Sequence, residues 1–162
     1  MEFSIREYKD SDREVLVDCM ERLQDYVIAV DPLRLVSRAP EFGELYTAWL
    51  LGIMKEQDGI IYFAEKEGRV IGCGAGMLPP QSLSEQAGGV PSKNGRVQEL
   101  YVDAEFRGEG VGQALMQKME DYFRKMGCDV AVVEVFAPNK NAHTFYKTNG
   151  YDERDINLMK IL

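Results

Sequence analysis

Three glycines at every second position mark the stretch of this sequence best suited to binding a ligand. They lie in the run Arg107-Gly108-Glu109-Gly110-Val111-Gly112, which follows a β-rich segment at 97–102 and precedes apolar residues at helical spacing. Glycines let the backbone turn tightly with its N–H groups exposed. The first N–H groups of a helix are unpaired and lie at the positive end of its dipole. The run therefore predicts an anion site, best suited to a phosphate.

Two common phosphate signatures do not fit this run. The chain contains no Gly-Lys-Ser/Thr, which excludes a Walker P-loop. The dinucleotide fingerprint Gly-x-Gly-x-x-Gly/Ala fails in both registers, because its last position falls on Gln113 or on Leu115. On its own, the run also fits an ordinary glycine-rich turn.

A third pattern, Arg/Gln-x-x-Gly-x-Gly/Ala, does match. Preceded by Leu-Tyr-Val and followed by Ala-Leu, the run 107–112 resembles the acyl-CoA pyrophosphate loop of the GCN5-related N-acetyltransferases (GNAT family). A second hallmark of that family, Asn-x-x-Ala-x-x-x-Tyr-x-x-x-Gly-Phe/Tyr, is matched further along by Asn139, Ala142, Tyr146, Gly150 and Tyr151. Two signatures in the right order are more specific than either alone. The resemblance is strong over residues 59–162 and extends to the first 58 only in pattern.

The resemblance implies a binding site for acetyl-CoA as co-substrate. In such a protein, the strands at 97–102 and 130–136 splay apart, and the pantetheine arm lies between them against the backbone near Leu100 and Val102. Asn139 then contacts the coenzyme arm. The expected coenzyme-binding residues are Leu100, Val102, Arg107, Gly108, Gly110, Val111, Gly112 and Asn139.

The resemblance also assigns two catalytic residues. Tyr146 occupies the position that faces the thioester sulfur. A thiol has a pKa near ~8.5 and a tyrosine near ~10, so a hydrogen bond to the departing thiolate suffices and full proton transfer is uphill. Glu99 is expected as the base, provided that its pKa is raised or that it acts late, after the amine has attacked. The alternatives are a Tyr146 that packs on the sheet and a Glu99 on a solvent-facing strand position.

The remaining reactive side chains are expected to be structural. His143 has no paired carboxylate pattern and is interpreted as a surface residue. The cysteines Cys19, Cys73 and Cys128 are odd in number, widely spaced and set in apolar patterns, which favours reduced buried thiols over disulfides, metal ligands or a nucleophile. We expect no metal. Lys140 and Lys147 could face the phosphates, but solvated surface positions are favoured.

Composition limits the partners. The chain has 162 residues, 45% of them hydrophobic and 28% charged, which suits a single domain over residues 1–162. The sequence shows no bilayer-spanning run and no basic-then-apolar leader, so we expect a cytoplasmic protein without a membrane partner. A net charge of −8 argues against nucleic acid and suits a cationic acceptor. A homodimer is left open.

The first half of the chain predicts a strand, two helices and a hairpin. A strand at 3–8 precedes Ser11-Asp12-Arg13-Glu14, a capping-box pattern that predicts a helix ending at Asp31-Pro32. A second apolar stripe runs from Phe42 to Ile53 and predicts a helix, on which Trp49 could line a pocket but is favoured in the core. The β-rich runs 59–66 and 69–78 predict a hairpin.

The second half holds the predicted parallel pair. Gly72, Gly74 and Gly76 fall on one strand face, where close packing is the favoured reason. Residues 79–95 predict a long structureless loop that could cover the acceptor site. The apolar run 128–137 should lie parallel to 97–102, joined by a right-handed crossover helix. A short helix at 139–147 and a last strand at 156–162 complete the chain.

These observations predict an α/β (α+β) fold with a GNAT-like mixed, mostly antiparallel sheet of six or seven strands, a splayed parallel central pair and helices on both faces. The expected activity is transfer of an acetyl group from acetyl-CoA to a primary amine of a small molecule or peptide, by direct attack in a ternary complex. The alternative is a non-catalytic acyl-CoA-binding sensor or regulatory module, which would not need Tyr146. A hydroxyl acceptor or a longer acyl group also stays open.

Overall fold

One mixed sheet organises the computed structural model, which describes residues 2–90 and 92–161. Within those ranges the sheet has five strands in the order β1-β2-β3-β4-β5, fewer than the six or seven predicted. The pairs β1–β2, β2–β3 and β3–β4 are antiparallel, and β4–β5 is parallel, as predicted. The parallel pair is not central, contrary to the prediction, because β5 is the edge strand of the described sheet. The strands are β1 (Ser4–Glu7), β2 (Ile60–Lys66), β3 (Arg69–Met77), β4 (Asn94–Val102) and β5 (Val130–Val133).

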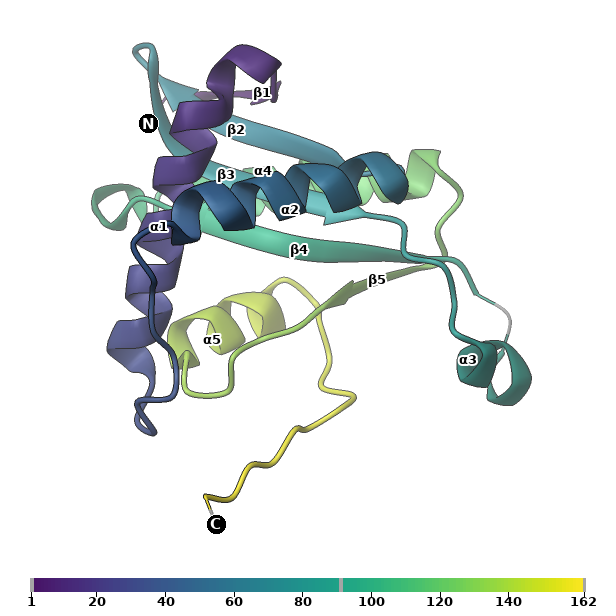
Figure 1. Cartoon of the computed structure of the whole chain (residues 1–162). Helices are drawn as coiled ribbons and strands as arrows, with labels where there is room; N and C mark the ends of the chain where they lie inside the picture. The colour runs from purple at the N-terminus through teal and green to yellow at the C-terminus, as the bar shows by residue number, and fades with distance from the viewer. Residues whose placement is uncertain (1, 91, 162) are drawn as a thin grey trace.

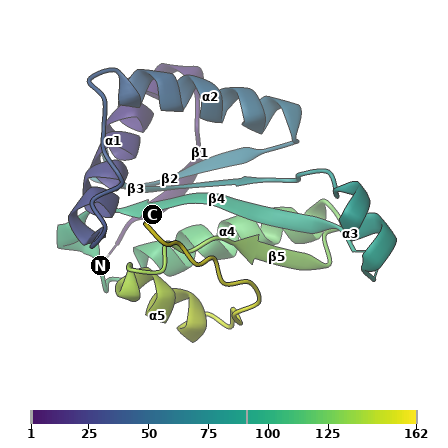
Figure 2. The same cartoon turned by 60° about the horizontal axis from the view of Figure 1, so that its bottom comes forward.

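Helices cover both faces of the sheet, which confirms the predicted layering (Figures 1 and 2). One face packs on the first two helices around Leu16, Leu50 and Phe63. The opposite face packs on α4 and α5 around Met116, Met119 and Tyr146. The helices are α1 (Arg13–Val30), α2 (Phe42–Glu56), α3 (Leu83–Gly88), α4 (Val111–Lys125) and α5 (Lys140–Thr148), with short 3-10 turns at Asp10–Asp12 and Ala104–Phe106.

The start of α1 differs from the capping-box prediction. Asp12, and not Ser11, is the N-cap residue. The Asp12 carboxylate accepts a hydrogen bond from the backbone N–H of Lys9 at 2.8 Å. It also forms an ion pair with Arg6 at 2.7 Å. These contacts belong to the 3-10 turn Asp10–Asp12 that leads into the helix, and the Asp12 side chain makes no capping hydrogen bond to α1. The helix ends at Asp31 before Pro32, as predicted.

The glycines of β3 confirm the packing explanation. A Cβ atom at Gly74 would lie 2.9 Å from Met119 Cε, and one at Gly76 would lie 2.7 Å from Phe123 Cζ. Gly72 comes equally close to the backbone of β4. The missing side chains at Gly74 and Gly76 therefore let α4 lie directly on the sheet.

The segment 79–95 is not structureless, contrary to the prediction. It contains α3, whose N-terminus carries the capping box that the sequence holds at Ser82 and Glu85. The backbone N–H of Glu85 donates to Ser82 Oγ at 3.3 Å, and the N–H of Ser82 donates to Glu85 Oε2 at 2.7 Å. The segment then enters β4 at Asn94, earlier than expected. The prediction of a loop was based on the Pro, Gly and Ser content of this segment and overlooked the capping-box pattern within it.

The predicted last strand is wrong for the part of it that the structure describes. Residues 152–161 form no strand, and residue 162 lies outside the described ranges. Ile156 and Leu158 are 76% and 89% exposed. Their alternation suits a strand, but a strand forms only against a partner edge. Figure 1 shows this segment leaving α5 and running away from the sheet.

Trp49 and the three cysteines were expected to be buried, and only part of this expectation is met. Trp49 is 47% exposed on α2, so its placement in the core is wrong; its ring instead lies 5.0 Å from that of Tyr46. The three cysteines are free, with Cys19 and Cys73 buried and Cys128 half-buried. No helix in the described ranges combines the length and apolar character needed to cross a membrane.

Candidate functional site

The parallel strands β4 and β5 separate partway along their length. They pair from Asn94 with Val130 to Val97 with Val133, and β5 then ends while β4 continues to Val102. The prediction extended the second strand to Phe136. Its apolar residues 134–136 instead line a gap beside β4, which explains how an apolar run can lie outside the sheet. This edge of β4 after Val97 is free of β5, as the predicted splay requires.

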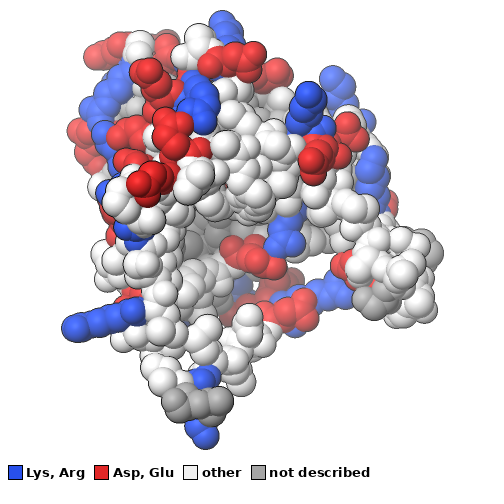
Figure 3. Space-filling model, viewed as in Figure 1, with Lys and Arg blue, Asp and Glu red and all other residues white. Residues whose placement is uncertain are grey.

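A cavity of about 190 Å³ occupies the gap between the separated strands. Figure 3 shows this face of the molecule hollowed between the main body and the part that carries β5 and α5. The cavity brings together four predicted site residues, Glu99, Leu100, Asn139 and Tyr146. Its lining also includes Met20, Leu23, Gln24, Val27, Phe42, Tyr46, Val97, Gln98, Val133, Glu134, Val135, Phe136 and Ala142.

Glu99 is held in the cavity by a partner from α2. The Tyr46 hydroxyl donates a hydrogen bond to Glu99 Oε1. Removal of the carboxylate from water raises its pKa, and the hydrogen bonds from Tyr46 and Gln98 offset only part of this effect. A carboxylate with a raised pKa is a stronger base once ionised. Glu99 thus has the direction of shift that a base for an amine needs.

Tyr146 reaches the same cavity from α5. Its side chain is 8% exposed, and its ring lies edge-on to those of Phe145 and Tyr151, at 5.2 and 5.7 Å between centroids. Burial first, and the negative charge of Glu99 second, raise the pKa of its hydroxyl. The hydroxyl therefore stays protonated at neutral pH. None of the described residues hydrogen bonds to it, so it can serve a ligand.

The glycine run forms the turn that starts α4. Gly108 and Gly110 have φ of +80° and +83°, a region that favours glycine, and no heavy atom lies within 4 Å of the position of a Cβ at either. Gly110 is the N-cap, and no described side chain caps this helix. The first N–H groups of this helix are therefore left without a side-chain cap, which fits a phosphate. Gly112 differs, since its Cβ would lie 3.3 Å from Phe145 Cζ.

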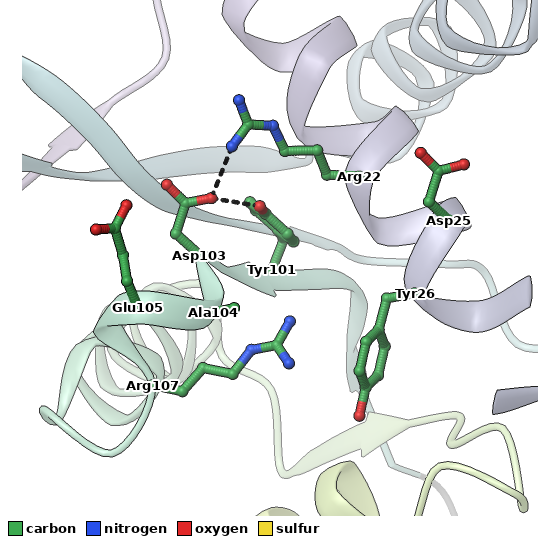
Figure 4. Close-up of a pocket in the computed structure, with 8 residues that line it drawn as sticks. All are labelled: Arg22, Asp25, Tyr26, Tyr101, Asp103, Ala104, Glu105 and Arg107. Carbon is green, nitrogen blue, oxygen red and sulfur yellow. Dashed lines mark hydrogen bonds and ion pairs between the residues drawn. The ribbon is translucent and has the colours of Figure 1, made fainter. Parts of the chain in front are cut away.

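Arg107 is exposed, and its side chain contacts two neighbours. Its Nε donates to the carbonyl of Val102 at 3.0 Å, and its guanidinium lies 4.6 Å from the centre of the Tyr26 ring (Figure 4). The Tyr26 hydroxyl in turn donates to Asn139 Oδ1 at 3.3 Å. Asn139 also caps α5 by accepting from the N–H of Ala142 at 3.1 Å. Tyr26 thus connects the glycine run with the start of α5.

A second hollow, of about 440 Å³, lies beside Arg107 and Tyr26 (Figure 4). Its wall contains Asp103, which accepts from Tyr101, from Arg22 at 3.1 Å and from Arg69 at 2.6 Å. Burial acts to raise the pKa of Asp103, but the hydrogen bonds from Tyr101 and Arg69 lower it overall. This carboxylate is fully engaged in joining α1 to β3 and β4, which is a structural role.

Tyr46 and Tyr26 were not predicted as site residues from the sequence. Tyr46 lies on the aromatic face Phe42, Tyr46 and Trp49, whose helical spacing was visible, but its partner Glu99 is 53 positions away. Of the other predicted residues, His143 lies at the surface, where it pairs with Glu153 at 2.6 Å. The described residues contain no cluster of three or more His, Cys, Asp or Glu that could hold a metal ion.

Comparisons with known proteins agree with this geometry. The model of the family described as "Acetyltransferase (GNAT) family" matches residues 20–151. An uncharacterized N-acetyltransferase of Methanocaldococcus jannaschii is 30% identical over 119 residues, which cover 72% of this chain and 48% of that protein. The chain spans less than two thirds of the length of each of the first three curated relatives that it matches.

Two further proteins are similar in sequence or in fold. Glucosamine 6-phosphate N-acetyltransferase of Arabidopsis thaliana is 26% identical over 105 residues, which cover 64% of this chain and 65% of that protein. A solved structure of AAC(6')-Iy in complex with the bisubstrate analogue CoA-S-monomethyl-acetylneamine has a TM-score of 0.73. It is 15% identical, and the match covers 100% of each chain.

Proposed function

This chain belongs to the acetyltransferase (GNAT) family, and from that premise we propose that it transfers an acetyl group from acetyl-CoA to a primary amine. The acceptor attacks directly while both substrates are bound. The observation that carries this proposal is the cavity between the separated strands, where Glu99 and Tyr146 line one small space. A base and a proton donor close together are what acyl transfer to an amine requires.

The glycine run is assigned to the pyrophosphate of the coenzyme. Its support is the uncapped start of α4 with open space at Gly108 and Gly110, together with the helix dipole. The pantetheine arm is assigned to the free edge of β4 at Leu100 and Val102, beside Asn139. Arg107 and Tyr26 lie between these two subsites, and Val111 and Gly112 begin the helix below the phosphates. Acetyl-CoA supplies the activated acyl thioester.

The two catalytic roles follow from protonation states. Glu99, once ionised, accepts the proton that the amine nitrogen loses on attack. Tyr146 keeps its proton at neutral pH and donates a hydrogen bond to the sulfur of the departing thiolate. None of the described lining residues is a cysteine, which supports direct transfer without an acyl-enzyme.

Related proteins support an amine acceptor. The Arabidopsis relative is named for an amino sugar phosphate, and the ligand of AAC(6')-Iy joins CoA to acetylneamine. A non-catalytic sensor is not favoured, because it needs the phosphate-binding turn but neither a buried proton donor nor a base with a raised pKa.

The test is a product assay. The protein is mixed with acetyl-CoA and a panel of primary amines, and free thiol and acetylated amine are both measured. We expect equal amounts of the two. Acetyl-CoA that binds without turnover of any amine, as followed by calorimetry, would favour the sensor and overturn the proposal.

A further inference from the structure

The part of the cavity wall that comes from α1 and α2 is mainly apolar. It consists of Met20, Leu23, Val27 and Phe42, with Gln24 and the Tyr46 hydroxyl as its polar groups. The Tyr46 hydroxyl is already bonded to Glu99. Gln24 donates its amide to the carbonyl of Ser37 at 2.9 Å. An acceptor that enters along this wall finds few free hydrogen-bonding partners.

Aromatic rings dominate the α2 part of this wall. The rings of Phe42 and Tyr46 stack at 5.1 Å between centroids with an angle of 15° between their planes. The Tyr46 ring continues to Trp49, at 5.0 Å. The Tyr46 hydroxyl bonds to the Glu99 carboxylate, so the Tyr46 ring lies next to that carboxylate and the Phe42 ring lies behind it. Aromatic faces of this kind favour another ring or an alkyl chain.

The charge of the lining selects further. Its ionisable groups in the described part of the chain include the carboxylates of Glu99 and Glu134 but no Lys, Arg or His. The cation next to the lining is Arg96 on β4, and it is already paired with Glu134. A phosphate or carboxylate on the acceptor would therefore meet no free cation among the lining residues, and burying an unpaired charge is costly.

We propose that the acceptor is an arylalkylamine: a primary amine on a short alkyl spacer, with an aromatic ring, and with neither a phosphate nor a carboxylate. The inference rests on the proposed acetyl transfer and narrows its acceptor. The ammonium group meets Glu99, and the ring packs against Phe42 and Tyr46. An amino sugar is disfavoured, because each of its buried hydroxyls would lose water without gaining a partner.

A matched series of amines tests the proposal. 2-Phenylethylamine and L-phenylalanine differ only in the carboxylate, ethylamine lacks the ring, and glucosamine 6-phosphate adds hydroxyls and a phosphate. We expect kcat/KM for 2-phenylethylamine to exceed that for each of the others by about 100-fold or more, as expected for one uncompensated buried group or one lost ring contact. Phenylalanine or glucosamine 6-phosphate used equally well would overturn the inference.

Variants on α2 separate the ring contact from general damage. Phe42→Ala and Phe42→Leu should lower kcat/KM for 2-phenylethylamine about tenfold or more, mainly through KM, with ethylamine little affected. Leu45→Ala is the matched control, because Leu45 is 67% exposed on the same helix and outside the lining. Equal losses on both amines would contradict a ring contact at Phe42.

The outcomes keep the two proposals apart. If glucosamine 6-phosphate or ethylamine is acetylated and 2-phenylethylamine is not, the acceptor class is wrong while acetyl transfer stands. If no amine of this series or of the panel is acetylated although acetyl-CoA binds, the proposed function itself fails, and this inference fails with it.

Discussion

At the scale of single residues, Tyr146 is the proposed proton donor, and burial raises the pKa of its hydroxyl and keeps it protonated at neutral pH. Tyr146→Phe retains the ring, which packs against Phe145 and Tyr151, and removes only the hydroxyl. General acid catalysis contributes ~10²- to 10⁴-fold, so we predict that kcat falls at least ~10²-fold when chemistry limits turnover, with acetyl-CoA affinity nearly unchanged.

Tyr151→Phe is the control for this variant. The Tyr151 hydroxyl bonds to Glu120 at 3.1 Å and does not line the cavity, so kcat should stay at the wild-type value. Single-turnover kinetics with both variants give the comparison. A Tyr146→Phe protein with wild-type kcat would remove Tyr146 from the mechanism, and loss of coenzyme affinity along with kcat would indicate a packing role.

Titration of Glu99, the proposed base, should raise kcat/KM and lower the stability of the fold as pH rises. Its pKa is raised in the folded state, so the folded protein binds the proton more tightly than the unfolded chain does. Between the unfolded pKa and the raised one, stability therefore falls as pH rises. We predict that Glu99→Gln matches the wild type in Tm below this window and exceeds it above, while losing the rise of kcat/KM with pH.

Thermal melts and pH–rate profiles of the wild type and Glu99→Gln check this prediction. A variant that is less stable than the wild type above the window would mean that ionised Glu99 stabilises the fold. That result would be incompatible with a carboxylate whose pKa burial raises.

Residues within one signature could be predicted from the sequence, and residues joined across the fold could not. Tyr146 and Asn139 follow from one spaced motif, and Glu99 from its place before the glycine run. Tyr46 became visible only when α2 packed over β4, because no local spacing connects it with Glu99. Asn139 also has a structural task, capping α5, that its signature did not reveal.

At the scale of elements, substitutions at the two ends of α4 can distinguish a loss of coenzyme binding from a loss of stability through backbone strain. Gly110 and Gly127 flank this helix with φ of +83° and +75°, and neither has a heavy atom within 4 Å of a Cβ. Alanine at either position should cost roughly 1–2 kcal/mol of stability. We predict that only Gly110→Ala weakens acetyl-CoA binding, by about tenfold or more.

Calorimetric titration of acetyl-CoA into both variants makes this comparison, with denaturant unfolding to match their stabilities. Gly112→Val is less informative, because its side chain would also contact Phe145. If Gly110→Ala and Gly127→Ala bind acetyl-CoA with equal affinity, the glycine run is an ordinary turn and not the phosphate site.

Element boundaries could be predicted where the local sequence pattern favours an element and the fold also supplies a partner for it to pack against. The hairpin of β2 and β3 and the crossover through α4 meet both conditions. The apolar run at 130–136 ended early as a strand, at Val133, because its neighbour diverges there. Residues 156–161 alternate like a strand but find no edge to pair with, whereas α3 formed from a capping box inside a segment that looked like a loop.

At the scale of the whole molecule, the net charge of −8 should guide cationic acceptors toward the protein. We predict that kcat/KM for a cationic amine falls as ionic strength rises over a few tenths molar, because salt screens charges beyond ~10 Å. At saturating amine, kcat should stay constant, since steering affects encounter and not chemistry. No salt dependence of kcat/KM, or a preference for an anionic acceptor, would contradict it.

The overall architecture follows from two signatures and the order of strands and helices around them. That order leads to the parallel pair, the crossover helix and helices on both faces. The acceptor side did not follow, because α1 and α2 carry no signature and their contribution depends on how they pack over β4. The cavity wall to which we assign selection of the acceptor is therefore a property of the assembled fold.

Direct acetyl transfer in this cavity can be tested by one single-turnover measurement. Protein in excess over acetyl-labelled acetyl-CoA is mixed with 2-phenylethylamine and ethylamine together and quenched over time. We predict that label appears on amine at the rate at which thioester is lost, with none on the protein, and that Tyr146→Phe slows both equally. Label that accumulates on the protein before the amine, or thioester lost to water alone, would contradict it.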